Sequence, residues 1–418
     1  MVNAVCYQGE ARMLSILYPK VPWIVRQLTI GLMPFTAKAD SIPKLIVKAT
    51  KETILAAKVR KSFSIYIIPY DVDGFQSLGF LAAFFDDGQH PLVVGGAFIK
   101  QFHARELAKL FLSPQVDVHF FDELGRELLG YRAEFKSTKK HRDMLVRAIF
   151  PRLEDIHQGR VMNAISDWFQ CSGPKDDAEA IKVSLEYSVI PEDMIIIDML
   201  PENHAFHGSK GYSFVTLERE EPGSFQEKEI VDLLQRTFKD NDVYLSPLRT
   251  YDNEEMADIL VISESSILIV QAKDSPNVER IINNTIDRKR KTTNGALKKG
   301  LSQVKGAISY IKRTSPMKIK LNEKEVDVSW EGKKLYALIV VKELFSDDYD
   351  QYTPPMLEVY EATGVPCITL SYNELHQYTR HLKGEVAFME AFMKVFNHGL
   401  ETGMFPRLRV HAPGAMGN

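Results

Sequence analysis

The sequence predicts an α/β protein with an N-terminal mixed α/β region and a C-terminal core in which helices flank a mixed sheet. Short apolar runs of strand type alternate with segments of helical periodicity along the chain. A polar stretch near residue 220 separates two parts with different patterns. The composition, 45% hydrophobic and 26% charged, is that of a globular protein and excludes a disordered or fibrous chain. A length of 418 residues suggests two or three domains.

The first part mixes strands and helices. Residues 62–70 and 90–97 have the composition of strands, residues 104–112 have helical spacing, and residues 116–121 alternate as a strand does before a turn and a second strand at 127–135. Residues 139–170 follow a helical pattern, 171–177 have loop composition, and 181–189 and 194–199 resemble strands.

The second part begins with an amphipathic helix. We expect helices at 225–238, 294–312 and 384–396, strands at 257–263, 266–272, 335–341 and 365–370, and a loop at 288–294. The predicted domains are therefore residues 1–145, with a role in sensing, targeting or assembly, a connecting region at 146–220, a second domain at 221–405 and a frayed tail at 406–418.

Charge and cysteine content limit the classes of function. Lys plus Arg number 52 and Asp plus Glu number 55, a net charge of −3, which excludes a protein that coats nucleic acid by overall positive charge. The three cysteines match no metal or redox spacing and fit a reducing compartment. The first residues do not resemble a signal peptide, and no apolar run is long enough to span a bilayer. We therefore expect a cytoplasmic protein with no membrane partner.

A predicted hairpin carries the most informative residues. Asp258 stands at the start of one strand, and Gln271, Ala272 and Lys273 end the next. Because side chains alternate along a strand, Gln271 and Lys273 share one face, and an acid, an amide oxygen and an ammonium group meet at one sheet edge. A surface lysine after a buried strand is the simpler alternative.

This pattern resembles the PD-(D/E)xK nuclease superfamily. Asp258 stands thirteen residues before Gln271, Lys273 follows two residues later, and the hairpin lies between two predicted helices. With glutamine in place of the acidic residue, the pattern is similar to Mrr-type restriction endonucleases and NERD-type nuclease domains. The resemblance covers about 180 residues, from about 220 to 400, and implies a restriction-endonuclease-like core. It also implies a Mg²⁺-dependent DNA endonuclease that acts in restriction or antiviral defence.

The resemblance also implies roles for single residues. Asp258, Gln271 through its side-chain oxygen, Ala272 through its carbonyl, and a glutamate of the first helix would hold Mg²⁺, which Mn²⁺ can replace. Hard divalent cations of this kind take oxygen ligands. Lys273 would orient the attacking water and offset phosphate charge. Glu227 fits the helix pattern of the family, and Glu229 is the competing choice; both would otherwise be solvated acids in a first helical turn.

A basic segment follows the hairpin. Residues 287–313 contain nine cationic residues and one acid, giving +8 where the whole chain is −3. Such a segment binds phosphates without regard to sequence. The predicted DNA contacts are Arg288, Lys289, Arg290, Lys291, Lys298, Lys299, Gln303 and Lys305. Gln303 and Tyr310 are seven residues apart, which places them on roughly one helix face. The alternative is a solvated charged face.

Three functions remain open at this stage. The first is the endonuclease, acting as a dimer or larger homo-oligomer, since cutting both strands takes two sites. An activating ligand or partner protein would then act at the N-terminal region. The second is a catalytically inactive nuclease-fold protein that binds nucleic acid, for which Gln271 leaves room. The third is a structural interaction module without DNA affinity.

Overall fold

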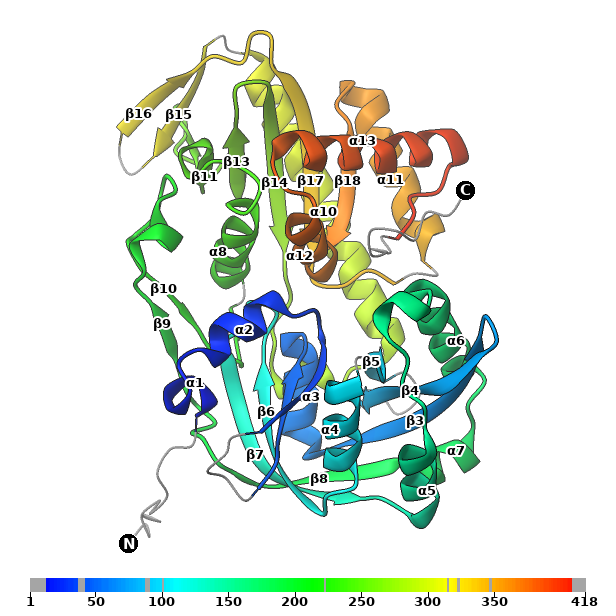
Figure 1. Cartoon of the computed structure of the whole chain (residues 1–418). Coiled ribbons are helices and arrows are strands. Elements are labelled where there is room, and N and C mark those ends of the chain that lie inside the picture. The colour runs from blue at the N-terminus through cyan, green and yellow to red at the C-terminus, as the bar shows by residue number, and fades with distance from the viewer. Residues whose placement is uncertain are drawn as a thin grey trace, which may run out of the picture.

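The computed structural model is a mixed α/β protein (Figure 1), as the sequence predicts at this level. It describes residues 13–36, 42–86, 91–99, 101–221, 223–313, 316–321, 324–345 and 348–407. The predicted tail at 406–418 lies almost wholly outside the described residues. We call residues 13–188 the N-terminal unit, 189–221 the connecting segment and 223–407 the C-terminal unit.

The N-terminal unit is built on one eight-stranded sheet with the strand order β1-β2-β6-β7-β8-β3-β4-β5. The strands are β1 (Gly31–Phe35), β2 (Lys44–Lys48), β3 (Ser62–Val72), β4 (Phe75–Phe84), β5 (Leu92–Ala97), β6 (Gln115–Phe121), β7 (Glu127–Lys136) and β8 (Ile181–Ser188). All pairs are antiparallel except β2 with β6. The strands predicted in this part of the sequence are present.

Helices cover this sheet and join its strands. They are α1 (Leu14–Leu17), α2 (Val21–Gln27), α3 (Lys51–Arg60), α4 (Gln101–Phe111), α5 (Lys139–Arg147), α6 (Gln158–Gln170) and α7 (Pro174–Glu179). Two predictions were wrong here. The helical pattern of 139–170 is split into α5 and α6, because Pro151 disfavours helical conformation at the residue before it. The expected loop at 171–177 contains the start of α7, where Pro174 occupies the first helical position.

The C-terminal unit is built on a five-stranded mixed sheet with the order β11-β13-β14-β17-β18. Its strands are β11 (Val243–Leu245), β13 (Ile259–Ile262), β14 (Ser266–Lys273), β17 (Lys334–Val341) and β18 (Cys367–Ser371), and its helices are α8 (Gly223–Leu234), α9 (Glu279–Ile282), α10 (Ile286–Arg313), α11 (Tyr349–Thr363), α12 (Tyr372–His381) and α13 (Glu385–Thr402). Two smaller sheets pair β9 (Ile196–Asp198) with β10 (Ser213–Val215), and β12 (Leu248–Arg249) with β15 (Met317–Leu321) and β16 (Lys324–Val328).

The expected loop at 288–294 does not exist, because α10 is helical from Ile286 onward. Gly295 and Gly300 lie inside this helix, although glycine disfavours helical conformation. Leu297, Leu301 and Val304 of α10 are buried in the C-terminal core. Packing of this apolar face outweighs the low helix propensity of the two glycines.

Two large hydrophobic cores divide along the chain. The C-terminal core contains β13, β14 and β17, and it also takes in Leu124 and Phe206 from earlier in the sequence. The N-terminal core contains β3, β4 and β6 and takes in Ile282 of α9. Each unit therefore contributes side chains to the other's core. No helix among the described residues is long and apolar enough to cross a membrane.

Candidate active site

The β13–β14 hairpin places the predicted site residues at one end of the central sheet. Ile259 pairs with Val270 in the antiparallel register, so Asp258, just before β13, lies opposite Gln271. On its other side β14 pairs in parallel with β17. Because β14 lies between two strands, its polar end is buried: Asp258 is 5% exposed and Gln271 only 1%. Buried groups of this kind need partners.

Lys273 supplies the partner for three oxygen atoms. Its ammonium nitrogen donates to Oδ2 of Asp258 at 2.8 Å, to Oε1 of Gln271 at 3.0 Å and to the carbonyl oxygen of Ala272 at 2.9 Å. The amide of Ala272 also donates to Oδ2 of Asp258 at 2.6 Å. The structure therefore brings together four of the predicted site residues. Their oxygens converge on a single cationic centre, which is the ammonium group of Lys273.

Glu227 of α8 is the carboxylate beside this cluster. Its side chain is partly buried and makes no hydrogen bond to another described residue. Burial, followed by the negative charges of Asp258 and Glu255, raises the pKa of Glu227 to about 7, against the opposing effect of Lys273. A carboxyl group with this pKa exchanges a proton near neutral pH, which suits general acid–base work.

Glu255 is a site-proximal acid that the sequence reasoning missed. It lies at the exposed edge of the site in the loop before β13. Partial desolvation of its carboxyl and the nearby charge of Asp258 raise its pKa, against a hydrogen bond with Ser246. The signal was the acidic pair Glu254 and Glu255 directly upstream of Asp258. Two further carboxyl groups, Glu227 and Glu255, therefore surround Asp258.

Glu229, the competing choice, has a different environment. Its Oε1 accepts from Lys51 at 2.6 Å and from Arg126 at 2.7 Å, both in the N-terminal unit. Burial raises the pKa of Glu229, but the charges of Lys51, Arg126 and Arg219 outweigh it and hold that pKa far below its usual range. Two residues along a helix correspond to a rotation of about 200°. Glu229 therefore faces the N-terminal unit, whereas Glu227 faces Asp258.

The cationic residues predicted to bind DNA lie along α10 but in two environments. Arg288, Lys291, Lys298 and Lys299 are exposed, and Lys305 is partly exposed. Lys289 instead forms an ion pair with Asp86 of the N-terminal unit. Arg290 pairs with Asp348 at 3.2 Å and lies over the ring of Phe345. Intramolecular partners therefore hold two of the predicted contacts.

Gln303 and Tyr310 lie seven residues apart in the continuous helix α10 and so on roughly one face, as expected, but their environments differ. Gln303 is exposed on α10. Tyr310 is 6% exposed and donates to the carbonyl of Lys318 in β15 at 2.6 Å. Gly300, by contrast, lies where α10 meets the site: a Cβ added there would be 3.4 Å from Cγ of Lys273.

The donor set fits a hard cation by its chemistry. One carboxylate oxygen, one amide oxygen and one carbonyl oxygen surround the ammonium of Lys273, and such oxygens are the ligands that Mg²⁺ takes. No group of three or more His, Cys, Asp or Glu side chains with metal-site geometry occurs among the described residues. The convergent set thus has one carboxylate, with Glu227 alongside it.

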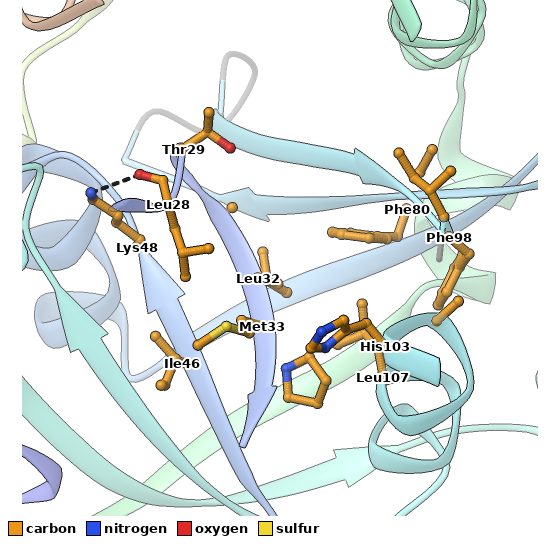
Figure 2. Close-up of a pocket in the computed structure, with 15 residues that line it drawn as sticks. Leu28, Thr29, Leu32, Met33, Ile46, Lys48, Phe80, Phe98, His103 and Leu107 are labelled. Atoms are coloured by element: carbon orange, nitrogen blue, oxygen red, sulfur yellow. Dashed lines mark hydrogen bonds between the residues drawn. The ribbon is translucent and has the colours of Figure 1, made fainter. Parts of the chain in front are cut away.

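A separate apolar cavity of about 320 Å³ lies in the N-terminal unit (Figure 2). Met33 of β1, Ile46 of β2 and Phe98 beyond β5 line it, with His103 of α4 at its side. The ammonium of Lys48 is directed to the carbonyl oxygen of Leu28, 2.9 Å away. None of the candidate active-site residues lines this cavity.

Comparisons with known proteins add no identity: no protein-family model matches the chain, and no curated protein matches its sequence.

Proposed function

We propose that the chain is a metal-dependent DNA endonuclease with a restriction-endonuclease-like core of the PD-(D/E)xK type, acting in restriction or antiviral defence. The observation that carries the proposal is the convergence of Asp258, Gln271 and Ala272 oxygens on one cationic centre. Glu227, with its pKa of about 7, lies beside that centre. Strongly perturbed acids next to a charge cluster are typical of catalytic sites.

The order of elements supports the same proposal. Helix α8 precedes the edge strand β11 and the antiparallel β13–β14 hairpin along the chain, and α10 and the parallel strand β17 come after the hairpin. This is the helix–strand–strand–helix order that the resemblance implies. The candidate residues come from the end of β14, the start of β13 and one face of α8, which rigid elements hold in place.

The chain's residues would hold Mg²⁺ or Mn²⁺ through Asp258, Gln271 and Ala272, with Glu227 as a further carboxylate. The bound ion would offset phosphate charge and lower the pKa of water. Lys273 would give up its present acceptors and donate to a phosphate oxygen or to the attacking water. The raised pKa of Glu227 belongs to the metal-free site, and a bound cation would favour its ionised form.

The exposed cations of α10 support DNA as the substrate. Arg288, Lys291, Lys298 and Lys299 are open to solvent on the helix whose Gly300 packs against Lys273. Cations on this helix can therefore hold a backbone next to the site, and each phosphate contact adds affinity that depends on salt.

A binding protein without catalysis is the second candidate. Its support is that Gln271 contributes no charge and that Lys273 already satisfies all three converging oxygens. Such a protein needs no metal to hold its buried polar groups. It would bind DNA through the same face of α10.

Cleavage of supercoiled plasmid DNA with Mg²⁺ or Mn²⁺ tests the proposal. Asp258→Asn and Lys273→Met should abolish cutting while DNA binding, followed by fluorescence anisotropy, is retained. The matched controls Asp327→Asn and Lys318→Met change exposed residues of the three-stranded sheet and should cut normally. Metal-independent binding by wild type with no cutting in either metal would support the second candidate. Absence of both binding and cutting at low salt would contradict both.

A further inference from the structure

A polar cavity of about 560 Å³ lies where the two units and the connecting segment meet. Its walls come from the end of α2, the loop before β7, the residues after β9, and helices α8 and α12. In Figure 1 α2 lies directly below α8 and α12. The volume is in the range of small-molecule sites, about 300–1,000 Å³. The candidate active site does not contribute to these walls.

Cationic side chains converge on this cavity from both units: Arg26, Arg126, Arg236, Arg380 and Lys383. Burial lowers the pKa of Arg236; Tyr372 and Asp232 oppose this effect, and the smaller contributions of Arg380 and Arg26 add to it. The positive charge of Arg236 also affects His376: burial, and after it the charge of Arg236, lowers the pKa of His376 to about 3. Arg236 is thus a largely buried cation with two further cations, Arg380 and Arg26, close enough to repel it.

Protein acids do not neutralise most of these cations. The side chains of Arg26, Arg236 and Lys383 make no hydrogen bond or ion pair to another described residue. Arg380 donates to the carbonyl oxygens of Gln27 and Leu28, and it has no carboxylate partner in the described part of the chain. Guanidinium groups bind phosphate oxygens in pairs of parallel hydrogen bonds. The free donors therefore suit a phosphate-bearing ligand.

Acceptors line the other side of the cavity. Asp198 and Asp240 are already hydrogen-bonded to Asn203 and Gln235, whereas Asp232 and Glu202 have no such partner among the described residues. Burial raises the pKa of Asp232 to about 7. A ligand that brings hydroxyl or amino groups as well as phosphate would satisfy these acids. Inorganic phosphate alone would leave them unpaired.

We propose that this cavity is a nucleotide-binding site, with Arg26, Arg236 and Arg380 on the phosphates and Asp232 on hydroxyl or amino donors of the nucleoside. The site is independent of the proposed nuclease activity. The ligand would touch α2 of one unit and α8 and α12 of the other, so binding would clamp the two units together. Because α8 also carries Glu227, the bound nucleotide would lie against the helix that lines the candidate active site.

Isothermal titration calorimetry on the full chain tests the proposal with ATP, GTP, adenosine, pyrophosphate and phosphate as probes. ATP or GTP should bind, and Arg236→Gln should weaken that binding at least tenfold. Arg26→Gln, a change at an exposed position, should weaken it severalfold without affecting folding. Arg152→Gln is the matched control, since its exposed side chain lies outside the cavity. Asp258→Asn should leave nucleotide affinity unchanged, which separates this cavity from the candidate active site.

Asp232→Asn separates the two halves of the ligand. This substitution should weaken the binding of ATP more than the binding of pyrophosphate, because Asp232 is assigned to the nucleoside. Absence of binding by either nucleotide up to millimolar concentration would overturn the proposal. So would binding that Arg236→Gln and Arg26→Gln leave unchanged, or pyrophosphate binding as tight as that of ATP. If Arg236→Gln does not fold, the Arg26 and Asp232 variants decide.

Discussion

Two glutamates of α8, separated by one residue, have opposite electrostatic environments. Glu227 lies near Asp258 and Glu255, and its pKa is raised to about 7. Glu229 accepts from Lys51 and Arg126, and the cations around it keep it ionised. The sequence placed both in one acidic turn. Their partners show that Glu229 joins the two units, whereas Glu227 remains available for the chemistry at the hairpin.

Replacing Glu229 by Gln should destabilise the protein by about 3 kcal/mol, because buried cations lose their common carboxylate. Glu227→Gln, at a position without such partners, is the matched comparison and should lose no stability while cleavage falls. Urea denaturation measures both free energies of unfolding. Equal stability of the two variants would contradict the assignment of Glu229 to the contact between units.

The stability of the protein should depend on the charge of Glu227. Its pKa is about 7 in the folded state against 4.5 ordinarily, so the folded state binds more protons between these values. Stability therefore decreases as pH rises from about 4.5 to 7 through this group. Relative to wild type, Glu227→Gln should gain about 2 kcal/mol across that window, allowing for partial exposure. Thermal unfolding from pH 5 to 8 measures the difference, and parallel pH profiles would contradict it.

The sequence predicted the local part of the site and missed the part made by folding. Asp258, Gln271 and Lys273 were predictable because alternation along two adjacent strands fixes their faces. The rotation that separates Glu227 from Glu229 could be calculated, but which one faced the hairpin depended on Lys51 and Arg126, more than a hundred residues away. No local pattern reveals a partner at that distance.

Among the elements, α10 carries both the basic surface and the contact with the site. Gly300 allows this approach: a Cβ there would lie 3.0 Å from Cγ2 of Ile339 and 3.4 Å from Cγ of Lys273. Gly295 and Gly306 of the same helix have open space at the corresponding position. The three glycines therefore form a matched series within one helix.

Gly300→Ala should destabilise the protein by about 1 kcal/mol and reduce cleavage, because the helix or Lys273 must shift. Gly295→Ala and Gly306→Ala should stabilise it by about 0.5–1 kcal/mol, since alanine favours the helix. Denaturant midpoints and plasmid cleavage measure both effects. Stabilisation by all three substitutions would show that α10 tolerates the added methyl group at the site.

Charge on the exposed side of α10 should determine the salt dependence of DNA binding. Lys298→Gln together with Lys299→Gln should reduce the slope of log affinity against log salt by about 1.8, or about 0.9 per lost phosphate contact. Lys318→Gln together with Lys320→Gln, on β15, is the control pair. Anisotropy titrations at several salt concentrations give the slopes. An unchanged slope in the α10 variant would show that DNA binds to a different surface of the protein.

The elements of the fold were predictable where periodicity was strong, as in β3, β13 and β14. The predicted elements were wrong where packing in the fold outweighed the local conformational propensity of a residue. Glycine suggested a loop at the start of α10, but burial of Leu297 and Leu301 keeps it helical. The β15–β16 hairpin was not predicted: its strands alternate apolar and charged residues, as in MKIKL of β15, but each is only five residues long.

At the scale of the whole molecule, polar contacts connect the two units. Lys51 and Arg126 bind Glu229, Lys289 pairs with Asp86, and Nε2 of His376 lies 2.9 Å from the carbonyl oxygen of Glu123. Leu124 also packs in the C-terminal core. The units thus share buried charge as well as apolar surface.

A fragment of residues 221–407 should therefore unfold about 10 °C below the full chain, since Glu229 and His376 lose their partners. The full chain should unfold in one calorimetric transition. Differential scanning calorimetry of both proteins measures this, with Lys51→Met in the full chain as the substitution that removes a single contact. A fragment as stable as the full chain would show that the units are energetically independent.

The position of Glu229 also has an evolutionary consequence. Its carboxylate is shared by Lys51 and Arg126, which also pair with Asp122, so a change at Glu229 leaves two buried cations with a single carboxylate between them. Substitutions at these positions are then tolerated only in combination. In a set of related sequences, residues 51, 126 and 229 should covary. Glu227, two residues away on the opposite face, should covary instead with Asp258 and Lys273.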